Sequence, residues 1–202
     1  MRRAFPAGIA LVAALAAGCT TLVRPEGPAN EAAWNQRLTQ LKQLQTWHLG
    51  GRIGVVTRRR GGSASLDWSE QGRHMKLRFS GPFGVGAVEL SGTPERFVIR
   101  NSKGKTWVTT TPALALEKSL GWPIPVASLR YWVTGRPAPG APYRLQLGSR
   151  GLVMSLEQQG WTVRYSAYSA VQGLLLPARL AASRSGGRVK LVVSQWQLAN
   201  RP

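Results

Sequence analysis

Apolar and polar residues alternate along two long stretches of the chain. Between His74 and Ser80, for example, the apolar residues Met75, Leu77 and Phe79 are each separated by a basic residue. This period of two is typical of a strand with one buried face and one hydrated face. It predicts eleven strands, at residues 48–56, 63–69, 74–80, 85–91, 96–100, 105–110, 143–147, 152–158, 161–168, 174–183 and 188–196.

The period changes to that of a helix in three places. From Glu31 the apolar residues Trp34, Leu38 and Leu41 recur at helical spacing, which predicts an amphipathic helix ending near Thr46. Asn30 is a suitable N-cap for it. Two shorter helices are expected between the two groups of strands, one over residues 112–120 and one over residues 125–134, because each begins at a proline and is followed by a glycine.

These elements predict a mainly β fold of the α+β class. Strands that follow one another through short links form an antiparallel sheet, and a single sheet of about eleven strands must curl. Its apolar concave face must then be covered, and the two short helices inserted between the strands are suited to cover it. The sequence therefore predicts one domain over residues 31–202, in which the long helix precedes the first strand of the sheet along the chain.

The N-terminus has the features of an export signal. Arg2 and Arg3 precede an apolar run over residues 7–17, which is too short to cross a bilayer comfortably, and small residues lead to Cys19. A cysteine after Leu-Ala-Ala-Gly resembles a bacterial lipoprotein processing site, where the thiol receives a diacylglyceryl group. This predicts a removed signal peptide over 1–18 and a flexible lipid-anchored tether over 19–30. An ordinary secretory leader followed by a stray cysteine is the alternative.

The residue after Cys19 helps to predict the membrane in which the lipoprotein is located. It is Thr20, not the aspartate that resembles an inner-membrane retention signal. The expected location is therefore the outer membrane, with the protein lipid-anchored and facing the periplasm.

Composition argues for a binding protein rather than an enzyme. The chain has two histidines and one Asp, and neither a metal-ligand cluster nor a paired acid and base is recognisable, so we expect no catalytic residue, no metal and no cofactor. The formal net charge of +19, or +17 without the leader, is typical of a protein that contacts something anionic, and a compositional bias toward arginine over a solvated surface is the alternative. A basic rim could steer an acidic carrier or lie against lipid headgroups. We expect no nucleic-acid partner, because the predicted location is the outer membrane.

Several segments together resemble one family. They are Gly-Arg-Ile-Gly-Val at 51–55, the strand 63–68, Gly-Pro-Phe-Gly at 81–84, the block 120–139, Gln-Gln-Gly-Trp-Thr-Val-Arg-Tyr-Ser-Ala-Tyr at 158–168 and the closing strand 188–196. Over nearly the whole chain from Trp34 to Trp196, the sequence resembles the outer-membrane lipoprotein receptors of the LolB family.

This resemblance implies a fold and a function. The fold would be an unclosed β half-barrel with a helical lid over an apolar cavity. The function would be to accept triacylated lipoproteins from the periplasmic carrier LolA and to insert them, as a monomer, into the inner leaflet of the outer membrane. A lipid- or lipopolysaccharide-binding lipoprotein without insertion activity and a purely structural lipoprotein are the alternatives.

The alternation supplies candidate walls for such a cavity. They are apolar residues on the same face of neighbouring strands and on the two short helices, and plain core packing is the alternative for each of them. The candidates are Leu66, Trp68, Leu77, Phe79, Val88, Leu90, Leu116, Leu120, Leu129 and Trp132.

One aromatic residue lies in an unusual place. Phe83 is flanked by Pro82 and Gly84 in a predicted turn between two strands. In the LolB family the matching loop carries an exposed apolar residue that resembles a membrane-inserting tip, which implies the same role for Phe83. The alternative is that Phe83 folds back and closes the mouth of the barrel.

Overall fold

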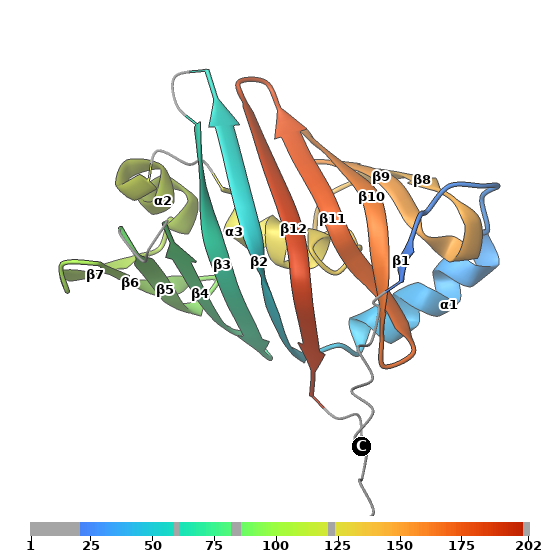
Figure 1. The fold of residues 1–202 in the computed structure, drawn as a ribbon, viewed down its shortest axis with the longest axis horizontal. Helices are drawn as coiled ribbons and strands as arrows, with labels where there is room; N and C mark the ends of the chain where they lie inside the picture. Colours follow the sequence, from blue (N-terminus) through green and yellow to red (C-terminus); the bar gives the residue numbers. More distant parts are fainter. Residues whose placement is uncertain (1–20, 59–60, 82–85, 121–123, 200–202) are drawn as a thin grey trace, which may run out of the picture.

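One antiparallel sheet extends through the part of the chain that the computed structural model describes, residues 21–58, 61–81, 86–120 and 124–199 (Figure 1). Cys19 and the loop residues Pro82, Phe83 and Gly84 lie outside the described residues. The predictions made for these four residues therefore stay predictions.

The sheet is open. From one edge to the other its strands are β7 (Thr106–Thr109), β6 (Arg96–Asn101), β5 (Val88–Thr93), β4 (His74–Ser80), β3 (Gly61–Gln71), β2 (Thr46–Thr57), β12 (Gly187–Leu198), β11 (Leu174–Arg184), β10 (Trp161–Val171), β9 (Val153–Gln158) and β8 (Tyr143–Leu147). Because β7 and β8 end this order, the described strands do not close into a barrel, which confirms the predicted unclosed sheet. The sheet has twelve strands instead of eleven because β1 (Leu22–Val23), which was not predicted, pairs with β10.

The last strand joins the two halves of the chain. β12 pairs with β2 along its length, from Leu198 opposite Trp47 to Gly187 opposite Thr57. Near the middle β12 bulges between Val193 and Gln195. Gly51 lies at this close approach, where a Cβ would stand 2.3 Å from the carbonyl oxygen of Val192. Any larger residue at this position would push the two strands apart.

The predicted alternation is confirmed by burial. In β4, Met75, Leu77 and Phe79 are at most 2% exposed, while Lys76 and Arg78 are exposed. The sheet thus has one apolar face, and the buried residues of most strands belong to one continuous hydrophobic cluster.

The first helix is shorter than predicted. α1 (Glu31–Lys42) begins as expected, with the side chain of Asn30 accepting a hydrogen bond from the backbone N–H of Ala33 at 2.9 Å. It ends at Lys42 and not near Thr46, because Thr46 opens β2 and pairs with Gln71. The sheet takes up these residues since it also buries Trp47, which lies 5.4 Å from each of the rings of Trp68 and Trp196.

The two short helices lie on one side of the sheet. α2 (Pro112–Leu120) and α3 (Val126–Trp132) connect β7 to β8, and in Figure 1 α3 passes behind β2 and β12. Val126, Leu129 and Trp132 of α3 are at most 1% exposed and belong to the same cluster as the sheet. The predicted helical cover is therefore present. None of the helices in the described residues is long and apolar enough to cross a membrane.

The segment before α1 lies against the fold at two points. Leu22 and Val23 pair with Ser169 and Tyr168 of β10. Further along, the hydroxyl of Ser149, in the 3₁₀ turn η2 (Ser149–Gly151), donates a 2.7 Å hydrogen bond to the carbonyl oxygen of Glu26. The described part of the expected tether is thus attached to the domain.

Candidate functional site

The predicted wall residues come together between the sheet and the helices. Those of β3, β4 and β5 lie on the concave face, and those of α2 and α3 face them. The side chain of Leu120 is outside the described residues. The other nine are at most 4% exposed and belong to one apolar cluster: Leu66, Trp68, Leu77, Phe79, Val88, Leu90, Leu116, Leu129 and Trp132.

The second half of the sheet also contributes buried residues to this interior, and the sequence prediction did not include them. Tyr165 and Tyr168 of β10 are buried, and their hydroxyls donate hydrogen bonds to the carbonyl oxygens of Trp132 (2.9 Å) and Val153 (2.7 Å). Burial raises the pKa of both hydroxyls, so they remain neutral donors. The alternation in β10 was a usable signal for Tyr165, whereas Tyr168 is out of phase with it and is buried because the register of β10 shifts between Tyr165 and Tyr168.

One end of α3 is fixed to β9 by a buried amide. The side-chain oxygen of Gln158 accepts hydrogen bonds from the indole N–H of Trp132 (3.0 Å) and the backbone N–H of Ala138 (2.8 Å). Its amide nitrogen donates to the carbonyl oxygen of Ala138 at 2.7 Å. Because Gln158 is 2% exposed, losing this group would leave several buried polar atoms unpaired.

The other side of α3 is fixed to β3 by an ion pair. Arg130 donates to a carboxylate oxygen of Glu70 at 2.7 Å and to the carbonyl oxygen of Gly72 at 3.0 Å. The second carboxylate oxygen of Glu70 accepts from the indole N–H of Trp68 at 3.2 Å. α3 therefore crosses the concave face with polar contacts at both β3 and β9. The buried residues in the described part of α2 are the apolar Pro112, Ala115 and Leu116.

Glu70 is an unusual carboxyl group. It is 2% exposed, and burial raises its pKa from 4.5 to about 7, against the opposing effects of Arg130 and of the hydrogen bond from Trp68. Near neutral pH the carboxyl group of Glu70, beneath α3, is therefore present in both its protonated and its ionised form.

Glu70 should make the stability of the protein depend on pH. Because its folded-state pKa exceeds the ordinary value, the folded protein retains a proton that the unfolded chain releases between about pH 4.5 and 7. The free energy of unfolding should fall by up to about 3 kcal/mol across this range as pH rises. Urea unfolding at several pH values measures it. Glu70→Gln should lack this component, whereas the exposed control Glu157→Gln should keep it; equal pH dependence in all three proteins would contradict the assignment.

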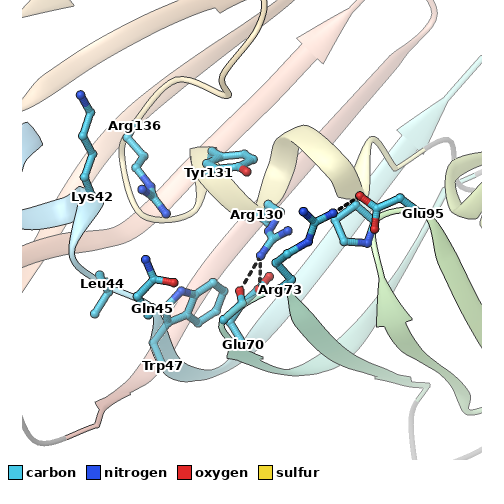
Figure 2. Close-up of a pocket in the computed structure, with 12 residues that line it drawn as sticks. Lys42, Leu44, Gln45, Trp47, Glu70, Arg73, Glu95, Arg130, Tyr131 and Arg136 are labelled. Atoms are coloured by element: carbon cyan, nitrogen blue, oxygen red, sulfur yellow. Dashed lines mark hydrogen bonds and ion pairs between the residues drawn. The ribbon is translucent and has the colours of Figure 1, made fainter.

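A polar pocket opens beside the Glu70–Arg130 pair, where α1, α3 and the sheet meet. It encloses about 390 Å³ (Figure 2). Basic side chains reach it from α1, from α3 and from the turns that follow β3 and α3, and two carboxylates and several apolar groups complete its wall. Its lining consists of Lys42, Leu44, Gln45, Trp47, Glu70, Gly72, Arg73, Pro94, Glu95, Arg130, Tyr131 and Arg136.

The described residues contain no cluster of histidine, cysteine and carboxylate side chains that could hold a metal ion. The arrangement that they do contain is an apolar interior beneath two helices, with a cationic pocket at its margin. Such a site is suited to holding an amphipathic ligand.

Solved structures support the fold. A LolA superfamily protein from Nitrosomonas europaea superposes with a TM-score of 0.57 at 10% identity, covering 87% of this chain and 96% of the other. A putative outer membrane lipoprotein-sorting protein domain from Vibrio parahaemolyticus superposes with a TM-score of 0.51 at 8% identity, covering 84% and 92%. At these identities the likeness concerns the fold alone.

Sequence relatives are closer. An outer-membrane lipoprotein LolB from Pseudomonas fluorescens is 37% identical over 186 residues, which cover 91% of each chain. The protein of the same name from Nitrosococcus oceani is 34% identical over 186 residues, covering 91% of this chain and 92% of the relative. The family model described as "Outer membrane lipoprotein LolB" matches residues 45–196, from the start of the sheet almost to the end of β12. By its sequence and its fold, this chain belongs to the LolB family of outer-membrane lipoproteins.

Proposed function

We propose that this protein accepts triacylated lipoproteins from the carrier LolA into its apolar interior and inserts them into the outer membrane. The observation that carries the proposal is the LolB family match over residues 45–196. The proposal involves no catalysis and no cofactor, in keeping with a family named for a lipoprotein and not for a reaction.

Physical chemistry explains why such a protein is needed. Three acyl chains contain about 45 methylene groups, and each costs about 0.8 kcal/mol to expose to water. The total is tens of kcal/mol, so a lipoprotein does not cross an aqueous compartment unassisted. A receptor must shelter the chains, and it needs no nucleotide hydrolysis if each transfer step is downhill.

The interior beneath the helices is the proposed acyl-chain site. Leu66, Trp68, Leu77, Phe79, Val88, Leu90, Leu116, Leu120, Leu129 and Trp132 remain its candidate walls. Because α3 is hydrogen-bonded to both β3 and β9, while the buried residues described for α2 are apolar, we expect the chains to enter by displacing α2. Apolar contacts of α2 can be exchanged for contacts with an acyl chain without leaving polar groups unpaired.

Membrane contact is proposed for the N-terminus and the loop after β4. Cys19 would carry the lipid after removal of residues 1–18 and hold the protein on the periplasmic side of the outer membrane. Phe83, between Pro82 and Gly84, would enter the inner leaflet during delivery. The protein would act as a monomer, since each of these parts is supplied by one chain.

A transfer assay tests the proposed function. LolA loaded with a radiolabelled lipoprotein is mixed with the purified mature protein and liposomes, and the label is followed from carrier to receptor to membrane. We expect the label to pass first to the receptor and then to the liposomes. Uptake of lipid without delivery would instead identify a lipid- or lipopolysaccharide-binding lipoprotein, and absence of any uptake would indicate a structural role.

A further inference from the structure

Two arginines of the polar pocket, Arg130 and Arg136, lie over one aromatic ring, but only Arg130 forms an ion pair. The guanidinium of Arg130 lies 5.4 Å from the centre of the Tyr131 ring, and that of Arg136 lies 5.1 Å from it. Arg130 has Glu70 as its carboxylate partner. The Nε of Arg136 is buried and has no hydrogen-bond partner among the described residues.

The backbone fixes Arg136 in this place. α3 ends in a turn in which Gly135 has a φ of +82° and donates to the carbonyl oxygen of Trp132 at 2.9 Å. The N–H of Arg136 then bonds to the carbonyl oxygen of Tyr131 at 3.2 Å. This pattern closes helices tightly and requires a residue such as glycine at the left-handed position. The backbone of Arg136 is therefore fixed beside the pocket by the end of α3, and its side chain lines the pocket.

The charges around Arg136 do not balance. Arg73 is paired with Glu95 and Arg130 with Glu70, whereas Arg136 and Lys42 form no ion pair among the described residues, and Arg136 feels Glu70 only as a more distant charge that Arg130 already pairs. Burial lowers the pKa of Arg136, but a guanidinium remains charged at neutral pH. A partly buried cation without a direct ion pair is costly, so an anion entering the pocket would recover part of this cost.

The pocket also has features of a site for an amphipathic anion. Figure 2 shows Arg136 and Arg130 on two sides of an open space, with Gln45 and Trp47 below them and Tyr131 above. Lys42 stands at the rim, with its amino group directed away from Arg136. Leu44 and Trp47, which line the pocket, also belong to the hydrophobic cluster of the interior. Cationic and apolar groups are thus adjacent, as a lipid with a charged head requires.

We propose that this pocket binds the phosphate group of a glycerophospholipid headgroup, with Arg136 as its principal contact. The planar guanidinium can donate two parallel hydrogen bonds to phosphate oxygens. Gln45 and Tyr131 line the same pocket and would donate to the same group, and Leu44 and Trp47 would contact the glycerol and the first methylenes. This site is distinct from the acyl-chain interior proposed for lipoprotein cargo, and it takes a ligand that the transfer function does not require.

Binding of water-soluble ligands to the full mature chain tests the site. The ligands are dihexanoyl phosphatidylglycerol below its micelle concentration, inorganic phosphate, and dihexanoylglycerol, which lacks the phosphate. Isothermal titration gives the affinities, and the ³¹P chemical shift reports on the phosphate itself. We expect the phospholipid to bind more tightly than either of the other two ligands. Equal binding of inorganic phosphate would overturn the headgroup assignment, and equal binding of dihexanoylglycerol would overturn the role of the phosphate.

Variants locate the binding. Arg136→Gln removes the charge and should weaken phospholipid binding by about 10- to 100-fold, as expected for the loss of a charge-assisted hydrogen bond. Arg136→Lys keeps the charge but cannot donate two parallel hydrogen bonds to the phosphate, so it should have an intermediate affinity. Arg100→Gln makes the same charge change at an exposed position of β6, outside the pocket, and should leave affinity unchanged. Equal weakening by Arg136→Gln and Arg100→Gln would show a general charge effect and overturn the proposal. Wild-type affinity in a folded Arg136→Gln protein would also overturn the proposal.

Discussion

Phe83→Glu is expected to accept lipoproteins from loaded LolA at the wild-type level and to deliver them to liposomes about 10- to 100-fold more slowly. Burial of one phenylalanine side chain in the bilayer contributes about 1.5–3 kcal/mol, and a carboxylate forfeits this contribution. Acceptance should be unaffected because the acyl-chain interior lies between the sheet and the helices. Label in the receptor and label in the liposomes are measured separately.

A conservative variant serves as the control for Phe83. Phe83→Leu keeps an apolar side chain of substantial size, so it should deliver nearly as well as the wild type. If Phe83→Glu delivered normally, the loop would have no role in membrane insertion. If it failed to accept cargo, Phe83 would belong to the mouth of the barrel, as the alternative reading of the sequence holds.

Trp132→Ala should lower the free energy of unfolding by about 3–5 kcal/mol, with a fall in Tm of about 10 °C. Trp132 is fully buried, its ring lies 6.1 Å from that of Trp161, and its indole N–H bonds to Gln158. The substitution removes a large apolar volume and also unpairs part of a buried polar group. Thermal unfolding followed by circular dichroism measures the loss.

The matched control is another tryptophan. Trp107 lies on the edge strand β7 and is only half-buried, so Trp107→Ala should cost about 1–2 kcal/mol. Similar losses for the two variants would mean that α3 is loosely packed. In that case α3, and not α2, would be the helix to displace when acyl chains enter.

The sheet could be predicted from the sequence because one face of nearly every strand is apolar. In β4 the burial of Met75, Leu77 and Phe79 follows directly from their spacing. Two boundaries could not be predicted in this way. The helical spacing of apolar residues continues past Lys42, but pairing of Thr46 with Gln71 in the sheet overrides it. β1 has only two residues, which is too few to form a pattern.

The polar part of the site could not be predicted, for a different reason. Glu70 and Arg130 are separated by sixty positions and meet only because α3 crosses the concave face. Arg136 is one of many basic residues, and nothing in its neighbours along the chain marks it as buried and unpaired. The net charge of +19 predicts an anionic partner but gives no location for one.

The short strand β1 has a consequence for how far the anchored protein can travel. A free tether over residues 19–30 could extend to about 40 Å, at about 3.5 Å per residue. With Leu22 held on β10, only two residues separate Cys19 from the sheet, and the three Cα–Cα steps from Cys19 to Leu22 span at most about 11 Å. If Cys19 carries the lipid as proposed, the free segment between the lipid and the sheet is much shorter than the whole predicted tether. The receptor would then stay close to the bilayer surface and could only reorient there, which raises the effective concentration of its own loops at the membrane. The carrier would have to bring the cargo across the periplasm to it.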